Sequence, residues 1–371
     1  MSEIVATAPA RIDFAGGTLD LPPIYLFHPP AYTVNVAIEL RARVSIASRK
    51  GRGIALSAQD RKAASRWPSR ELIEWKRQRW LELPARLIHS LGPMSGYDVK
   101  THLESPPGAG LGGSSTLGIA LCGALLAYRD ATGRKGDRPR QKSPGLDDSH
   151  LADSEPVPFS AETPWPAERL IEHAKSIETQ TIRVPTGYQD FVAAYYGGAS
   201  AIEYTTIGFT RTPACSATFL KILEQHLMLV YSGKPHFSGA NNWELFKKHG
   251  DGDRKTVAFF EALRRSAEAM KNAFAHEDLR EIGSGLNNDW RIRRAMLPEM
   301  TTPKIERLIA AAMKNGAFAA RVCGAGGGGC VAFLVEPDAR DSLARAFTQL
   351  NGLVLPVAIA RSGLTVHGLP E

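Results

Sequence analysis

The sequence is poor in cysteine and has no long apolar run, and both absences narrow the class of protein. Its cysteines are Cys122, Cys215, Cys323 and Cys330. They include no CxxC pair and have no histidine at metal-ligand spacing, so neither a disulfide framework nor a zinc site is predicted. No stretch of about 18 or more apolar residues occurs, which excludes an ordinary membrane-spanning helix. The N-terminus shows no secretory signal pattern, and a cytoplasmic protein with reduced thiols is expected.

The charge balance is basic but does not by itself indicate nucleic acid. The net charge is +7 at pH 7, and much of the excess lies in residues 49–80 and 132–142. Such runs are more often solvated surface than a binding face. No recognisable nucleic-acid module accompanies them. We therefore expect no nucleic-acid partner and no membrane partner, while an anionic small molecule is compatible with the charge.

The length of the chain predicts more than one domain. A chain of 371 residues is long for a single hydrophobic core, and its composition of 43% hydrophobic and 22% charged residues is ordinary for a globular protein. A shift in composition near residue 205 predicts domains 1–205 and 206–371. Residues 131–166 are rich in charge and proline and lack apolar periodicity, which predicts a mobile insertion in the first domain.

Apolar periodicity predicts the secondary structure around these features. Strands are expected over 4–14, 31–47, 97–105 and 227–233, with a strand, a glycine loop and a second strand over 317–336. Helices are expected over 70–90, 115–133, 167–179 and in several parts of 255–315. Pro84 is expected to interrupt the first of these helices. The helix over 115–133 is apolar nearly all round and should be buried on most faces.

The segment PPGAGLGGSSTLG, residues 106–118, joins a predicted strand to this buried helix. Its glycines allow backbone N–H groups to approach an anion, and the helix start adds unpaired N–H groups and its dipole. No lysine follows Gly113, so the segment is not the Walker form, and no acidic residue closes a second strand as in a dinucleotide site. The pattern favours a phosphate site. The alternative is turn chemistry, with Ser114 and Ser115 capping the helix.

Three segments resemble the motifs of the GHMP kinases, the family of galactokinase, homoserine kinase, mevalonate kinase and phosphomevalonate kinase. They are APARIDFAGGTLDLP, PPGAGLGGSSTLGIA and RVCGAGGGGCVAFL, in the order of the family. The combination of GGTLD with TGYQDFVAAYYGG looks most like the sugar kinases of the D-glycero-D-manno-heptose 7-phosphate kinase and galactokinase-like group. The resemblance implies an α+β fold of two domains, the first like ribosomal protein S5 domain 2 and the second ferredoxin-like.

The resemblance also implies an ATP- and Mg²⁺-dependent kinase that phosphorylates a hydroxyl, expected to be anomeric, of a sugar or sugar phosphate. The residues that would wrap the ATP phosphates are Pro107, Gly108, Ala109, Gly110, Leu111, Gly112, Gly113, Ser114 and Ser115. Ser114 and Glu178 would hold the Mg²⁺. Because the family often has serine at the position of Gly113 and alanine at that of Thr116, Ser115 is an alternative metal contact.

The remaining site residues follow from the same motifs. Asp190 in GYQD matches the presumed base toward the attacking hydroxyl, and Arg11 matches a family cation beside that base. Asp20 is similar to the residue that holds sugar hydroxyls. The other substrate-binding residues implied are Gly17, Thr18, Gly187, Gly326 and Gly327. Judged from residue type alone, Asp190 could instead cap a helix, Asp20 could form an Asx turn, and residues 324–329 could be a hairpin turn.

Two other functions stay open on the sequence. One is a GHMP kinase for a non-sugar acceptor of the mevalonate or homoserine type. The other is a non-catalytic sugar- or nucleotide-binding regulator on the same fold. The joint presence of Asp190, Glu178, Ser114 and Arg11 favours catalysis, because a regulator need not keep all four. A monomer or homodimer is expected.

Overall fold

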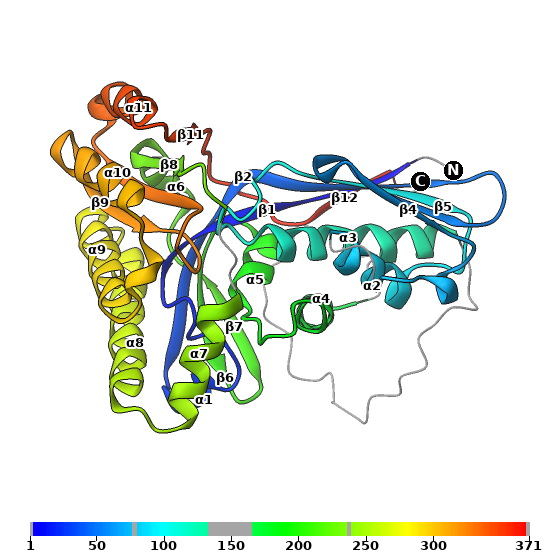
Figure 1. Cartoon of the computed structure of the whole chain (residues 1–371), viewed down its shortest axis with the longest axis horizontal. Helices are drawn as coiled ribbons and strands as arrows, with labels where there is room; N and C mark the ends of the chain where they lie inside the picture. The colour runs from blue at the N-terminus through cyan, green and yellow to red at the C-terminus, as the bar shows by residue number, and fades with distance from the viewer. Residues whose placement is uncertain (1–2, 76–79, 133–164, 236–238, 369–371) are drawn as a thin grey trace.

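The structure is a computed structural model that describes residues 3–75, 80–132, 165–235 and 239–368 (Figure 1). Most of the insertion predicted over 131–166 lies outside the described residues. None of the described helices is both long and apolar enough to cross a membrane. The four cysteines are all free.

The larger sheet has eight strands and is built around two long ones. Its order is β12-β1-β2-β5-β3-β4, with β6 paired to β2 and β7 paired to β6. The strands are β1 (Ile4–Ala15), β2 (Ala31–Ser48), β3 (Ile54–Ala58), β4 (Ala63–Trp67), β5 (Tyr97–Leu103), β6 (Ala199–Thr205), β7 (Gly208–Pro213) and β12 (Thr365–His367). The strands predicted from the alternation of apolar residues over 4–14, 31–47 and 97–105 are confirmed.

The pair β1–β2 bends near the middle of the molecule (Figure 1). The β1–β2 register shifts between Pro9 and Ala10, where proline has no N–H to donate to the ladder. Beyond the shift, residues 10–15 are buried on both faces of the strand. Because side chains alternate along a strand, Arg11 and Asp13 point to one face.

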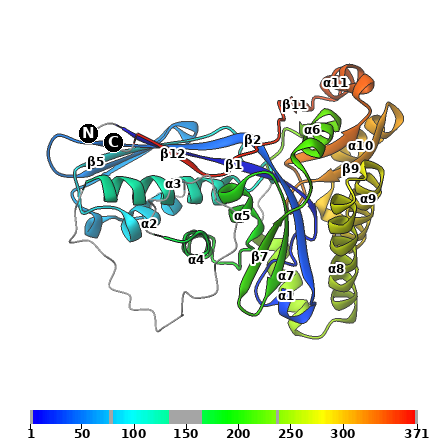
Figure 2. The same ribbon diagram turned by 180° about the vertical axis from the view of Figure 1, so that it is seen from behind.

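Four helices lie along one face of the larger sheet, as Figures 1 and 2 show from opposite sides. They are α2 (Glu82–Leu91), α3 (Gly113–Ala131), α4 (Ala167–Ile182) and α5 (Gln189–Tyr196). Helix α3 is buried from Ser115 to Tyr128, which confirms the predicted core helix. The helix predicted over 70–90 is wrong in its extent. Helix α2 begins only at Glu82, so Pro84 falls in its first turn, where a missing N–H costs nothing.

The smaller sheet has the strand order β11-β8-β10-β9 and is antiparallel. Its strands are β8 (Leu227–Tyr231), β9 (Ala317–Val322), β10 (Cys330–Val335) and β11 (Leu353–Leu355). The helices in and around this half are α6 (Ala217–His226), α7 (Gly239–Gly250), α8 (Arg254–Ala275), α9 (Leu279–Met296), α10 (Pro303–Lys314) and α11 (Arg340–Gln349), and the short α1 (Ile24–Phe27) belongs to the first half. This chain order and strand order are those of a ferredoxin-like unit, which confirms the predicted class.

The two halves are joined through shared structure. Helix α8 packs on β1 and β2, helix α9 packs on β1, and one hydrophobic cluster contains residues of both sheets. The division at residue 205 stays a proposal. It falls in the turn between the paired strands β6 and β7, and β12 returns residues 365–367 to the larger sheet. The strand pairing therefore favours assigning residues up to 213, together with 365–367, to the first domain.

Candidate active site

The glycine-rich segment forms a loop between β5 and α3 whose backbone only glycine adopts easily. Gly108, Gly110 and Gly112 have φ of +63°, +76° and +73°. Alternation of left-handed and ordinary residues turns successive N–H groups toward one side, which makes a concave anion site. Helix α3 begins at Gly113 with Gly112 as its N-cap and no side-chain cap. The alternative that Ser114 and Ser115 cap α3 is therefore wrong, and its first N–H groups remain available to a ligand.

The other predicted phosphate-loop residues support this loop from the protein side. Ala109 and Leu111 bury their side chains in the core, and the carbonyl of Leu111 accepts a hydrogen bond from the backbone N of Arg11 at 3.2 Å. Pro107 is exposed. A Cβ on Gly113 would lie 3.0 Å from Ser105 Oγ, and one on Gly112 would lie 3.0 Å from the Asp190 carboxylate. The loop therefore touches Asp190 through its backbone.

Arg11 and Asp190 form an ion pair against this loop. Arg11 comes from β1, and Asp190 is the second residue of α5. Nε and Nη2 of Arg11 lie 2.7 and 2.6 Å from Oδ1 of Asp190, and Nη1 donates to the carbonyl of Gly110 at 2.7 Å. Burial lowers the pKa of Arg11, but the charges of Asp190 and Asp13 outweigh it and the net pKa is raised.

The exposure of this pair differs between its two members. Arg11 is buried, whereas the Asp190 side chain is 24% exposed. Since both guanidinium contacts converge on Oδ1, the other oxygen, Oδ2, faces Gly112. Asp190 makes no side-chain cap of α5, so the capping alternative for it is wrong. The carboxylate is held firmly at one oxygen and remains reachable beside the phosphate loop.

Glu178 of α4 meets both serines of the loop. Ser114 Oγ donates to one carboxylate oxygen, and Ser115 Oγ donates to the other at 2.7 Å. Glu178 is 5% exposed, so its carboxylate is buried at the loop and does not lie on a solvated helix face. Burial raises its pKa to about 7, with Asp190 adding to the rise and the two serine hydrogen bonds opposing it.

The oxygens of this cluster fit Mg²⁺ in kind. A carboxylate and hydroxyls are hard ligands, and Mg²⁺ usually takes one or two carboxylates together with phosphate oxygens and water. Within the described ranges, no group of three or more His, Cys, Asp or Glu side chains could hold a metal. Any Mg²⁺ held by Glu178 with Ser114 or Ser115 would therefore take its further ligands from a bound phosphate and from water.

Asp20 is held by backbone N–H groups beside the same carboxylate cluster. Its Oδ1 accepts from Thr18 N and its Oδ2 from Gln189 N, both at 3.1 Å. A Cβ on Gly187 would lie 1.8 Å from Oδ2, so only glycine fits there. Burial and then the charge of Asp190 raise the pKa of Asp20 to about 6. The structure thus brings Asp20, Thr18 and Gly187 together. We call residues Gly16–Asp20 the acceptor loop, after the substrate-binding role that the sequence predicts for Gly17, Thr18 and Asp20.

The second glycine loop, residues 324–329, packs on the first one. A Cβ on Gly110 would lie 2.4 Å from the carbonyl of Cys323, and one on Gly329 would lie 2.7 Å from that of Ala109. Gly327 N donates to the carbonyl of Met300 at 2.7 Å, and a Cβ on Gly326 would lie 2.5 Å from the same oxygen. These glycines allow close backbone packing, and a role of Gly326 and Gly327 in binding substrate stays a prediction.

Four charged residues next to the site were not predicted from the sequence. Asp13, Asp289, Arg293 and Arg321 are all buried and connected by ion pairs. Two local signals point to them. Asp13 lies on the same strand face as Arg11, and Asp289 and Arg293 have the i, i+4 spacing of a helical ion pair. Arg321 stands in an apolar strand without such a signal.

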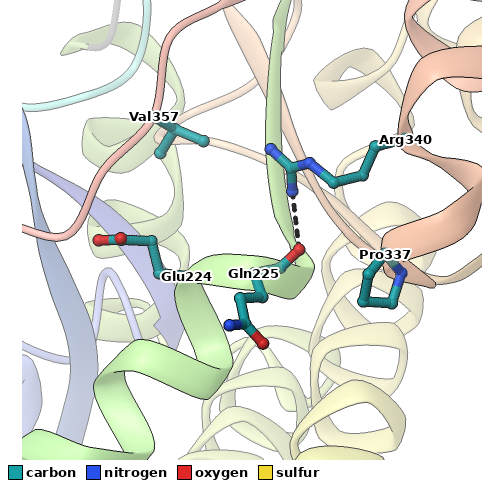
Figure 3. A pocket seen from close by; sticks show the side chains of 5 residues that line it. All are labelled: Glu224, Gln225, Pro337, Arg340 and Val357. Carbon is teal, nitrogen blue, oxygen red and sulfur yellow. Dashed lines mark hydrogen bonds between the residues drawn. The ribbon is translucent and has the colours of Figure 1, made fainter.

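A separate surface hollow of about 380 Å³ is lined by Glu224, Gln225, Pro337, Arg340 and Val357 (Figure 3). Its two charged side chains, Glu224 and Arg340, already have partners. Arg340 Nη1 donates to the carbonyls of Gln225 and Leu227 at 3.0 and 2.8 Å, and Glu224 accepts from Ile359 N at 2.6 Å. We assign it no ligand.

Comparison with known proteins agrees with the geometry. The family described as GHMP kinases C terminal matches residues 266–351. The chain is 23% identical over 370 residues to the D-glycero-alpha-D-manno-heptose 7-phosphate kinase of Campylobacter jejuni, with 98% of both chains covered.

Solved structures of similar fold include two sugar kinases. A D-glycero-D-manno-heptose 1-phosphate kinase from Bacteroides thetaiotaomicron has a TM-score of 0.71 at 20% identity, with 99% of this chain and 100% of that chain covered. The Lactococcus lactis galactokinase complexed with galactose has a TM-score of 0.72 at 17% identity, with 98% and 95% covered. The resemblance to the GHMP kinases and the two-domain α+β fold that it implied are therefore confirmed.

Proposed function

We propose that this chain, which has the fold and the C-terminal domain of the GHMP kinases, is an ATP-dependent kinase that phosphorylates a hydroxyl of a sugar or sugar phosphate. The observation that carries the proposal is the contact between the Arg11–Asp190 pair and the glycine loop at Gly110 and Gly112. It sets a carboxylate able to accept a proton directly beside a loop suited to phosphate. Phosphoryl transfer requires this alignment more than covalent help.

The chain's own residues supply three functions in this reaction. N–H groups of the loop and of the α3 start bind the phosphates of ATP. Asp190 takes the proton of the acceptor hydroxyl while the hydroxyl oxygen bonds to the γ-phosphorus of ATP. The bond between the γ-phosphorus and the oxygen that bridges it to the β-phosphorus breaks, and ADP leaves. Arg11 holds Asp190 at Oδ1 and leaves Oδ2 toward the loop. Mg²⁺, when bound near Glu178 and Ser114 or Ser115, would neutralise phosphate charge.

The relatives support a phosphorylated sugar as acceptor. The Campylobacter jejuni relative is named a heptose 7-phosphate kinase and matches over nearly its whole length, so heptose 7-phosphate is the first acceptor to test, and we propose the anomeric hydroxyl as its site. Non-sugar acceptors and a non-catalytic regulator are not favoured by these relatives. A cytoplasmic location and a monomeric or homodimeric state stay predictions.

The test is Asp190→Asn measured with ATP and a panel of heptose 7-phosphate, galactose, mevalonate and homoserine. We expect turnover of the wild type with a sugar acceptor and a loss of about 10²–10⁴-fold in kcat for the variant. Asp341→Asn, a change at an exposed position of α11, is the matched control and should retain activity. Near wild-type turnover by Asp190→Asn would refute the assignment of the base, and turnover of a non-sugar acceptor alone would refute the substrate class.

A further inference from the structure

The acceptor loop is attached to helix α9 at three consecutive residues. Arg293 Nη2 donates to the carbonyl of Gly17, and Nη1 lies 3.5 Å from Thr18 Oγ1. Asp289, one turn earlier on α9, accepts from Gly16 N at 3.2 Å. The two α9 side chains also bind each other, with Arg293 Nε 2.7 Å from Asp289 Oδ2. A helix of the second half of the chain therefore holds a loop of the first half through hydrogen bonds.

The middle of this loop has a strained backbone. Thr18 has φ of +80°, a region that a β-branched residue rarely adopts. Such a conformation persists only where the surroundings hold it. The backbone conformation of Thr18 also affects Asp20, because Thr18 N donates to Asp20 Oδ1 at 3.1 Å. The conformation imposed at residue 18 therefore helps to aim the Asp20 carboxylate.

A second ion pair, between Arg321 and Asp13 of β1, supports Asp289 and the acceptor loop from the other side. Arg321 donates to both carboxylate oxygens of Asp13, at 3.0 and 2.5 Å, and its Nε lies 3.3 Å from Asp289 Oδ2. Asp13 in turn lies against the loop, since a Cβ on Gly17 would be 2.2 Å from its Oδ2. Burial raises the pKa of Asp13, but Arg321, Arg293 and Arg11 outweigh it and the net pKa is lowered. The two aspartates and two arginines balance in charge, so the cluster is a scaffold rather than an anion site.

We propose that Arg293 is a positioning residue for the acceptor: it holds the acceptor loop with Thr18 in the strained conformation that orients Asp20. This proposal rests on the sugar kinase function proposed above. Arg293 itself is a positioning and not a catalytic residue, because its three guanidinium nitrogens contact Asp289, Gly17 and Thr18. Its loss should therefore change binding of the acceptor much more than binding of ATP.

The test compares Arg293→Met with Arg294→Met, a change at the next residue of the same helix. Arg294 is about half exposed and pairs only at 3.4 Å with Glu306 among the ion pairs of the described residues. We expect Arg293→Met to raise the acceptor KM about 10- to 100-fold, with the ATP KM within about twofold of wild type. Arg294→Met should leave both unchanged. An equal rise of both KM values, or no rise for the acceptor, would overturn the proposal.

A double-mutant cycle with Thr18→Gly separates positioning from simple loss of stability. Glycine adopts positive φ without strain, so the loop of a Thr18→Gly variant depends less on Arg293. We expect Arg293→Met to raise the acceptor KM by a clearly smaller factor in the Thr18→Gly background than in the wild type. Equal factors in the two backgrounds would show that Arg293 does not hold residue 18, and would overturn the proposal.

Two further measurements keep the test decisive. If Arg293→Met does not fold, Arg293→Lys keeps the charge beside Asp289, but one ammonium cannot serve Asp289 and Gly17 as the guanidinium fork does, so the acceptor KM should still rise. Hydrogen exchange of the amides of residues 16–20 needs no turnover. It should be about tenfold faster in the Arg293 variant than in Arg294→Met, and unchanged exchange would refute the positioning role. Absence of sugar phosphorylation by the wild type would refute the proposed function instead.

Discussion

Substitution of Gly187 by alanine should disable Asp20 without touching the phosphate loop. The added Cβ would lie 1.8 Å from Asp20 Oδ2 and 2.1 Å from its Cγ, so the carboxylate must move by more than an ångström. The φ of Gly187 lies outside the left-handed region, so the backbone itself adds no strain. A displacement of this size at a substrate-positioning group lowers kcat/KM about 10²-fold, and we expect that loss for the acceptor.

The same substitution has a predictable cost in stability. Movement of Asp20 breaks at least one of its bonds to Thr18 N and Gln189 N, and a hydrogen bond to a charged group contributes about 1.5–3 kcal/mol. Replacing glycine by alanine returns about 0.4–1 kcal/mol through the unfolded state. The free energy of unfolding should therefore fall by about 0.5–2.5 kcal/mol.

The assay combines steady-state kinetics with urea unfolding. The matched control is Gly118→Ala in α3, where a Cβ would meet Ala174 Cβ at an ordinary 3.8 Å, and it should keep wild-type kinetics. The ATP KM should stay unchanged in both variants. Wild-type acceptor kinetics in Gly187→Ala would show that Asp20 does not orient the acceptor, and the reasoning from this contact would be wrong.

Two further predictions concern the charged groups at the phosphate loop. The pKa of Glu178 is about 7 against an ordinary 4.5, so the folded protein holds an extra proton between these values and its stability should fall as pH rises from about 4.5 to 7. Urea unfolding in EDTA should show that the free energy of unfolding declines less steeply with pH in Glu178→Gln than in the wild type. An identical pH dependence in the two proteins would contradict the raised pKa of Glu178. Arg11→Lys should lower kcat about tenfold or more, because an ammonium cannot reach Asp190 and Gly110 at once. The control is Arg49→Lys, at a partly exposed position that pairs with Asp98, and it should retain wild-type kinetics. A wild-type kcat for Arg11→Lys would refute the orienting role.

The spacing of apolar residues was enough to predict the strand and the helix that hold the site. The alternation over 4–14 and the apolar helix over 115–133 appear as β1 and α3 because burial of a face dictates their periodicity. The extent of the helix over 70–90 was predicted wrongly, since proline is tolerated in a first turn and residues 70–72 form only a 3₁₀ turn. The rule that proline interrupts a helix therefore could not show that α2 begins at Glu82, two residues before Pro84.

The glycine loops show where local reasoning ends. Positive φ at Gly108, Gly110 and Gly112 fits the density of glycine in the segment. The contacts of Gly110 with Cys323 and of Gly326 with Met300 join residues far apart in the chain. No spacing in the sequence predicts them, because they depend on how β9, β10 and the α9–α10 connection pack against the phosphate loop.

The sequence by itself determined the kind of chemistry, through glycine-rich backbone, a helix start and carboxylates in three motifs whose local conformations follow from residue type. Only the tertiary structure decided which groups meet. It brings Arg11 into contact with Asp190, 179 residues away in the chain, and both serines into contact with Glu178. It also brings Arg293 into contact with Gly17 of the acceptor loop, 276 residues away. The physical reason is that hydrogen bonds and ion pairs act over a few ångströms, so the packing of distant elements alone determines these pairs.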